Sequence, residues 1–246
     1  MLAHQMVSGI WSPASLGSIC TGWWHAEKGI TLNGSTVSAW KNQQATNYWA
    51  QATAANQPAY TANALNGKHG LTFDGSKSEL ALWAAANATT AVNESALHPV
   101  GGWLFAAVWQ TQTTSSSGTG SRPALYSAQS AYSIYEFSST GPSAVIRNYD
   151  GATSVEVAVT IATSTNYASM WWYDGTNLKN QLGNGTPASS ACGSESDVVH
   201  QPNMGANYNS TVLFKGLVYE MVVCNAVPTA AQRSQLLNYL KAGWGV

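Results

Sequence analysis

Residues 155–161 read Val-Glu-Val-Ala-Val-Thr-Ile, and this alternation of apolar and polar side chains decides the fold class. In an extended chain successive side chains point to opposite faces. The β-branched residues at every second position therefore share one face, and Glu156, Ala158 and Thr160 share the other. One apolar and one polar face are typical of an antiparallel sheet that covers a core. The stretch predicts a half-buried antiparallel strand.

Other runs along the chain extend this pattern. Residues 217–224 are mostly apolar with partial alternation, and residues 103–109 are apolar on both faces, which suits a strand in the middle of a sheet. An Asp-Gly pair follows the runs 71–73 and 170–173, and this dipeptide is typical of tight turns between strands. Long polar loops are predicted at 111–123 and 183–197.

The chain ends with a predicted helix at about 229–242. Thr229 suits the N-cap position, and Gln232 three residues later completes a capping box. We expect Gly243 to end the helix and Trp244 to anchor the chain end against the sheets. The apolar stripe of the helix consists of Leu236, Leu237 and Leu240. Many strands and one terminal helix predict an all-β antiparallel sandwich with a short C-terminal helix.

Length and composition narrow the function classes. The chain has 246 residues, which suits a single all-β domain, and 9% of them are charged with a net charge of −1. This balance provides no basic surface for nucleic acid, and no apolar run reaches the length of a membrane span. Trp and Tyr, 11 of each against 4 Phe, favour rings with a polar group. The residues predicted to be buried are Trp40, Phe73, Trp172 and Leu237.

The first 20 residues contain no Lys or Arg and no continuous apolar core, so we interpret them as lacking a signal peptide. The cysteines are odd in number and widely spaced, at Cys20, Cys192 and Cys224. This spacing is neither a disulfide framework nor a zinc motif. We therefore expect free thiols in a protein made in a reducing cytoplasm.

In its motifs and their order, the chain from about Pro13 to Val246 resembles the concanavalin A-like, laminin G-like jelly-roll domains of phage and bacterial surface proteins. The resemblance rests on the stretches 13–26, 37–43, 57–75 and 216–245. It implies an antiparallel jelly-roll β-sandwich over residues 16–246, preceded by an N-terminal arm over residues 1–15. The matching positions Trp40, Phe73, Asp74, Gly75 and Glu220 are interpreted as core and turn residues, with Glu220 satisfying backbone donors.

Catalytic and metal motifs are sparse. The family frequently has Asp at the positions of His25 and Asn42, so no metal site and no cofactor are predicted here. Glycosidases of this fold need paired carboxylates, and Glu195 with Asp197 is a partial match in which His200 replaces the last Glu. Because this pair falls in a polar loop, the sequence predicts that the protein is not an enzyme.

One aromatic strand face is a candidate contact surface. Alternation places Tyr167, Ser169, Trp171 and Tyr173 on the same side of the run that ends at residue 173. Three alternatives remain for this face: packing under a loop, contact with a partner protein, and stacking on a glycan.

The main functional hypothesis is a non-enzymatic phage virion protein, either a head decoration or a tail-associated sandwich. It would be made in the host cytoplasm and located in the virion, and it would bind other virion proteins or itself. Ile10 and Trp11 are the predicted anchors of the arm, since buried aromatic residues dominate interface energetics. The alternative is a carbohydrate-binding, lectin-like or receptor-binding module, and a glycoside hydrolase is ranked third. Neither a nucleic-acid nor a membrane partner is expected.

Overall fold

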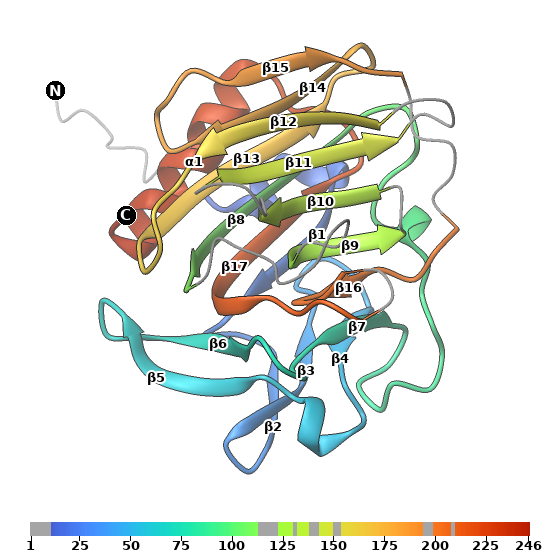
Figure 1. Ribbon diagram of the computed structural model, residues 1–246, viewed down its shortest axis with the longest axis vertical. Helices are drawn as coiled ribbons and strands as arrows, with labels where there is room; N and C mark the ends of the chain where they lie inside the picture. The colour runs from blue at the N-terminus through green and yellow to red at the C-terminus, as the bar shows by residue number, and fades with distance from the viewer. Residues whose placement is uncertain are drawn as a thin grey trace, which may run out of the picture.

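A computed structural model describes residues 11–112, 123–129, 132–137, 143–149, 154–193, 199–207 and 210–246. Of these, residues 129, 132–137, 148 and 149 are described by their backbone alone. Figure 1 shows strands in two layers with one helix on an outer face. This is the predicted all-β antiparallel jelly-roll sandwich with a C-terminal helix. Ile10, Glu195 and Asp197 lie outside the described residues.

The first half of the chain forms two short 3-10 helices and eight strands, with a third 3-10 helix before the eighth. These are η1(Pro13–Ile19), β1(Cys20–His25), β2(Ile30–Asn33), β3(Thr36–Lys41), β4(Tyr48–Ala50), η2(Ala54–Asn56), β5(Ala59–Leu65), β6(Lys68–Asp74), β7(Leu80–Trp83), η3(Glu94–Ala96) and β8(Trp103–Thr111). The second half forms β9(Ala124–Gln129), β10(Tyr132–Phe137), β11(Ser143–Tyr149), β12(Ser154–Thr160), β13(Asn166–Tyr173), β14(Asn177–Leu182), β15(Ala188–Ala191), β16(Asn203–Met204), β17(Lys215–Cys224) and α1(Ala230–Trp244).

Hydrogen-bonded pairing defines the layers. In the back layer the order is β15, β14, β13, β8 and β17, and β17 continues to β1 along one half and to β6 and β5 along the other. In the front layer the order is β12, β11, β10, β9, β16, β7, β4, β3 and β2. All of these pairs are antiparallel. Helix α1 packs on the outer side of the back layer, against β13 and β8.

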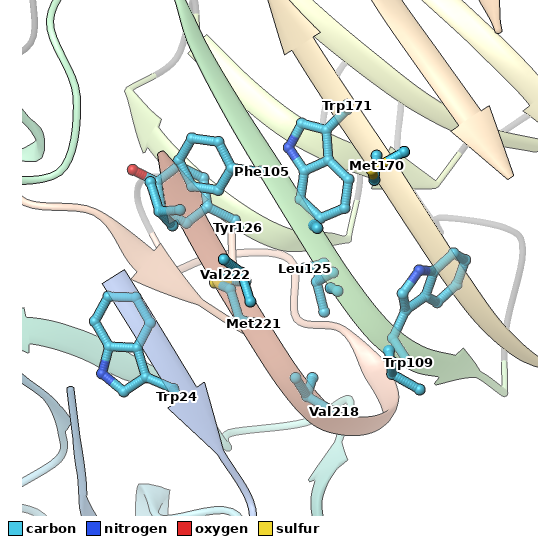
Figure 2. Close-up of a cluster of buried hydrophobic side chains, with 14 of the residues drawn as sticks. Trp24, Phe105, Trp109, Leu125, Tyr126, Met170, Trp171, Val218, Met221 and Val222 are labelled. Atoms are coloured by element: carbon cyan, nitrogen blue, oxygen red, sulfur yellow. The ribbon is translucent and has the colours of Figure 1, made fainter. Parts of the chain in front are cut away.

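Aromatic side chains fill the space between the layers (Figure 2). Phe105 of β8 and Tyr126 of β9 lie with their ring centroids 4.7 Å apart, and Trp49 of β4 meets the same tyrosine edge-on at 6.0 Å. The four residues predicted to be buried, Trp40, Phe73, Trp172 and Leu237, are at most 4% exposed. The prediction that these four residues are buried is confirmed.

The predicted strand at 155–161 is β12, whose positions 156, 158 and 160 are exposed as alternation requires. Strand β17 is buried on both faces, and on the side that does not face the sandwich its Glu220 is hydrogen-bonded to Trp244 of the helix. The loop predicted at 183–197 is partly wrong, since β15 pairs with β14 inside it. Small residues at 188–191 gave no alternation by which to recognise that strand.

The C-terminal helix begins as predicted. Thr229 is the N-cap, and its hydroxyl and the Gln232 amide form the reciprocal capping box. The predicted stop at Gly243 is wrong by two residues, because Gly245 adopts the left-handed conformation, with φ +70°, that closes the last turn. Trp244 thus belongs to the helix and is fully buried. No helix in the described part of the chain is long and apolar enough to span a membrane.

We predict that Trp172→Ala lowers the free energy of unfolding by about 3–5 kcal/mol, as large aromatic truncations in cores do. Trp172 lies between β13 and α1 and is 2% exposed, with the Arg233 guanidinium 5.0 Å from its ring centroid. Denaturant unfolding measures the change. Leu32→Ala is the control, because Leu32 is 47% exposed and should lose less than about 1 kcal/mol. A loss below about 1 kcal/mol for Trp172→Ala would contradict the packing.

Candidate functional site

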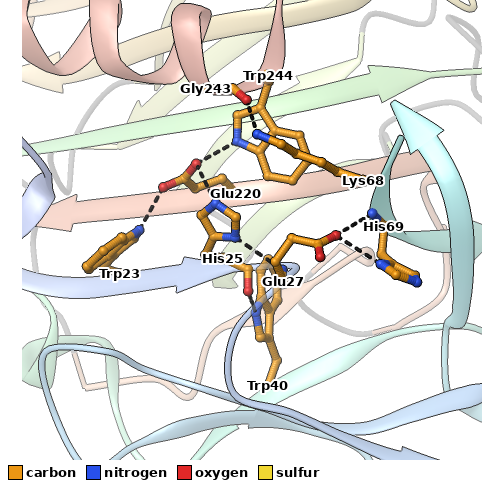
Figure 3. Close-up of polar contacts among 9 residues, drawn as sticks. All are labelled: Trp23, His25, Glu27, Trp40, Lys68, His69, Glu220, Gly243 and Trp244. Atoms are coloured by element: carbon orange, nitrogen blue, oxygen red, sulfur yellow. Dashed lines mark hydrogen bonds and ion pairs between the residues drawn. The ribbon is translucent and has the colours of Figure 1, made fainter. Parts of the chain in front are cut away.

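A buried carboxylate connects the helix to the back layer. Glu220 of β17 follows a bulge in the pairing with β8 and is 1% exposed. Its Oε1 accepts a hydrogen bond from Trp23 Nε1 at 2.7 Å, and its Oε2 accepts one from Trp244 Nε1 at 2.6 Å. The Tyr239 side chain also hydrogen-bonds to it. Figure 3 shows the two indoles reaching the carboxylate from β1 and α1. We call this arrangement the Glu220 clasp.

The chemistry of the clasp follows from its burial. Burial raises the pKa of Glu220, while the Trp and Tyr donors favour its ionised form and oppose that rise. Burial and the neighbouring carboxylate raise the pKa of Tyr239, so its hydroxyl stays protonated and donates a hydrogen bond to Glu220. The prediction that Glu220 satisfies backbone donors is therefore corrected, because its partners are side chains. Both of its oxygens are engaged in holding β1 and α1 together.

His25 lies beside the clasp. Its Nε2 is 3.8 Å from Glu220 Oε2, and its ring centroid is 5.0 Å from that of Trp244. Its Nδ1 accepts the Glu27 backbone N–H at 3.1 Å, so the ring proton resides on Nε2 and points to the carboxylate side. Burial, followed by the charges of Lys28 and Lys68, lowers the pKa of His25 to about 4. The imidazole is therefore neutral at pH 7.

The rim of the clasp joins the β5–β6 hairpin to the end of the helix. His69 Nδ1 lies 2.9 Å from Glu27 Oε1, and its ring stacks on Tyr60 with centroids 4.5 Å apart. Lys68 donates to the Gly243 carbonyl, and its Nζ lies 5.1 Å from the centroid of the Trp244 ring. These contacts close the clasp toward solvent. Within the described ranges, no three His, Cys, Asp or Glu side chains are grouped to hold a metal ion.

Asn42 and His25 occupy positions where the resembled family frequently has Asp. Asn42 is buried; its Oδ1 accepts the backbone N–H groups of Trp23 and Gln44, and its Nδ2 donates to the Thr21 carbonyl and to Asn47 Oδ1. An Asp carboxylate has no N–H and could not make the last two bonds. The amide is thus a structural junction that positions Trp23.

A pocket of about 520 Å³ lies on the outer side of α1. It is lined by Trp11, Gln235, Asn238, Tyr239, Ala242 and Gly243, and we call it the Trp11 pocket. The helical residues follow the i, i+3, i+4, i+7, i+8 spacing of one helix stripe. Trp11 lies over this stripe, with its ring centroid 5.7 Å from that of Tyr239 and tilted by 58°. None of the lining side chains is charged.

The clasp supports the Trp11 pocket from behind. Tyr239 contributes one ring wall of the pocket, its side chain is hydrogen-bonded to Glu220, and its ring meets Trp23 edge-on at 6.5 Å. The aromatic wall is thereby held in one orientation, while Gln235 and Asn238 are exposed at the rim. Rings offer an apolar face and amides offer donors and acceptors. The pocket can therefore hold a small uncharged molecule that has one apolar face and several hydroxyl groups.

The predicted aromatic face lies in the sandwich interior. Ser169, Trp171 and Tyr173 are at most 2% exposed, and Tyr167 is half-buried. Ser169 Oγ accepts the Trp109 indole N–H at 2.8 Å. Buried side chains of this kind have no accessible surface for a glycan ring, so packing within the chain accounts for the face.

The predicted arm anchor and the pocket coincide at one residue. Trp11 was expected to contact a neighbouring subunit, and in the structure it packs on Tyr239 of its own chain. Gln235 and Asn238 were missed because amides on the polar face of an amphipathic helix carry no functional signal in the sequence. The one available signal was an apolar Trp outside any predicted strand.

Comparisons with known proteins show the fold. No family model and no curated protein matches the chain. The structure is similar to Trypanosoma rangeli sialidase, with a TM-score of 0.52 and 13% identity over 90% of this chain and 33% of that one. It is also similar to domain 4 of AbnA, a GH43 extracellular arabinanase from Geobacillus stearothermophilus, solved with arabinotriose. That match has a TM-score of 0.53 and 11% identity, over 89% of this chain and 98% of that domain.

Mouse laminin α1 domains LG4-5 also match, with a TM-score of 0.45 and 13% identity over 66% of this chain and 53% of that one. The chain spans about a third of the length of the sialidase it matches. At the level of the fold, the jelly-roll β-sandwich part of the resemblance is confirmed by the sialidase and arabinanase matches, and the phage part receives no support. The prediction that the chain is not an enzyme is corrected, because structures of glycoside hydrolases have this fold.

We predict that His25 titrates with a midpoint near pH 4, followed by NMR of its ring protons. The folded pKa is below the ordinary value of about 6.5, so the unfolded chain binds the proton more readily. The stability contributed by neutral His25 is therefore present above about pH 6.5 and is lost as the pH falls toward 4. His25→Phe keeps a ring on Trp244 and should show a smaller loss of stability across that window. A midpoint above pH 6 would contradict the burial of the imidazole.

We predict that Glu220→Gln lowers the free energy of unfolding by about 1–3 kcal/mol, since an amide presents an N–H₂ group to one of the indole donors. Chemical denaturation measures the loss. Glu156→Gln is the matched control, because Glu156 is 38% exposed on β12 and should change stability by less than about 1 kcal/mol. Equal stability of the wild type and Glu220→Gln would show that the clasp does not hold the helix.

Proposed function

We propose that the chain is a carbohydrate-binding β-sandwich whose Trp11 pocket takes one ring of an uncharged saccharide. The observation that carries the proposal is the pocket itself: two aromatic rings, two exposed amides and no charged side chain in its lining. A volume of about 520 Å³ falls within the range of small-molecule sites. The Trp11 and Tyr239 rings would pack on the C–H face of the sugar, and Gln235 and Asn238 would bind its hydroxyls.

The comparisons support this choice at the level of fold. The domain of the arabinanase that matches over 98% of its length was solved with arabinotriose, and the matching sialidases were solved with sialic acid and with inhibitors. Those ligands belong to those proteins. An uncharged saccharide is favoured here over an acidic one because no lining side chain of the pocket carries a positive charge.

The phage virion role and the virion location stay predictions from the sequence. Trp11, one of the two proposed anchors of the arm, packs on Tyr239 of its own chain, and the other, Ile10, lies outside the described residues. Binding of a surface glycan is therefore the better supported of the two readings.

We predict that Trp11→Ala weakens saccharide binding by about tenfold, because an aromatic contact contributes roughly 0.5–1.5 kcal/mol beyond area burial. Isothermal titration against arabinotriose and a panel of neutral oligosaccharides measures the dissociation constant. Asn238→Ala tests the rim amide independently and should also weaken binding.

The matched control is Trp83→Ala. Trp83 is half-buried on β7 of the front layer and donates to the Ala50 carbonyl at 3.1 Å, so its loss should leave affinity unchanged. Affinity that survives both Trp11→Ala and Asn238→Ala would contradict the pocket assignment. Chromatography of the titrated oligosaccharides shows whether they stay intact. Release of shorter products would show that the protein is a hydrolase and not only a binding module.

A further inference from the structure

Cys20 and Cys224 face each other across the β1–β17 pair. They are register partners, and the next residues outward, Ile19 and Asn225, share a hydrogen bond from the Asn225 N–H to the Ile19 carbonyl at 2.9 Å. The register shifts between Cys20 and Gly22, so the two cysteines pair at the end of the ladder, just beyond a bulge. In a regular antiparallel ladder, the pair beside a hydrogen-bonded position is a non-hydrogen-bonded pair, whose Cα atoms lie about 4.5 Å apart. Disulfides join cysteines whose Cα atoms are about 4.4–6.8 Å apart.

The side chains of the two cysteines are also suitably placed. Register partners point to the same face of a sheet, and both residues are buried, Cys224 completely. Cys20 Sγ donates a long hydrogen bond of 3.6 Å to the Gly22 carbonyl, and the Cys20 thiol is near enough to Cys224 to raise the pKa of that residue electrostatically. The third cysteine, Cys192, follows β15 at the opposite edge of the back layer and is remote in strand order.

We propose that Cys20 and Cys224 form a disulfide when the chain folds in the presence of a small-molecule disulfide such as oxidised glutathione. The thiolate of one cysteine attacks a glutathione sulfur, the glutathione S–S bond breaks, and one glutathione thiolate leaves. The thiolate of the other cysteine then attacks the mixed disulfide and releases the second glutathione. The two protein thiols lose two protons and two electrons, and the glutathione disulfide is reduced to two thiols.

The environment of the pair sets when the bond forms. Burial raises the pKa of Cys20 to about 12 and also raises that of Cys224, so the folded protein offers almost no thiolate for exchange. The bond therefore forms during folding, before β1 is covered, and is protected from reductants afterwards. It closes a loop that includes most of the chain, and it lies on the same two strands as Trp23 and Glu220.

The test refolds the reduced, denatured full chain with oxidised and reduced glutathione. The product is then unfolded again in denaturant with an excess of alkylating reagent, so that buried free thiols react, and its peptides are mapped by mass spectrometry. The expected product is a Cys20–Cys224 linked peptide two hydrogens lighter than its parts, with Cys192 alkylated. Cys192→Ser should retain the link, and Cys20→Ser should leave Cys224 alkylated. Alkylation of both Cys20 and Cys224 in the refolded wild type would overturn the proposal, as would a link to Cys192.

Thermal unfolding provides a second measurement. A bond that closes so long a loop should raise the Tm of the oxidised protein by about 5–10 °C over the reduced one. Cys20→Ser, which removes the bond and leaves the glutathione conditions unchanged, should show no such difference. Equal Tm values for the oxidised and reduced wild type would contradict a bond that stabilises the native strand pair.

Discussion

One buried carboxylate holds the outer helix to the sandwich. Glu220 brings together an indole from β1, an indole from the last turn of α1 and the Tyr239 hydroxyl. Burying a carboxylate costs free energy unless its oxygens are hydrogen-bonded. The three donors offset that cost, and the carboxylate in turn gives each donor an acceptor. Because the donors come from segments near both ends of the chain, the clasp forms when the whole back layer has assembled. The stretch 220–244 supplies the carboxylate and two of its donors, and the third donor, Trp23, comes from the other end of the chain.

The same constraint reaches the surface through Tyr239. Its hydroxyl is committed to the clasp while its ring borders the pocket beneath Trp11. A ring fixed at one end loses little freedom when a ligand packs on it, and such preorganisation favours binding. The exposed amides of Gln235 and Asn238 stand on the same helix stripe, so the helix that the clasp positions also positions the polar contacts. A single buried group thus links the stability of the helix to the geometry of the pocket.

The sequence predicts the parts of this structure that are set by short-range patterns. The strand at 155–161, the central strand at 103–109 and the capping box at Thr229 depend on alternation, apolar content or a three-residue spacing, which are visible locally. The clasp is not visible in this way, because Trp23 and Glu220 are 197 residues apart. An isolated Glu among apolar residues indicates a buried carboxylate, but its partners are selected by the register of β1 on β17 and by the docking of the helix.

The pocket lies outside the strands of the sandwich, so its lining is set by individual residues and not by the fold. The sandwich is shared with proteins only 11–13% identical, so it says little about the ligand of this chain. The Trp11 pocket lies on the outer helix and on a residue that precedes the first strand, outside the strands that define the fold. Differences in the helix stripe or in the preceding segment can therefore change the ligand while the sandwich stays the same. The proposal of an uncharged saccharide rests on the neutral lining of the pocket, and the fold contributes the back layer against which that lining is held.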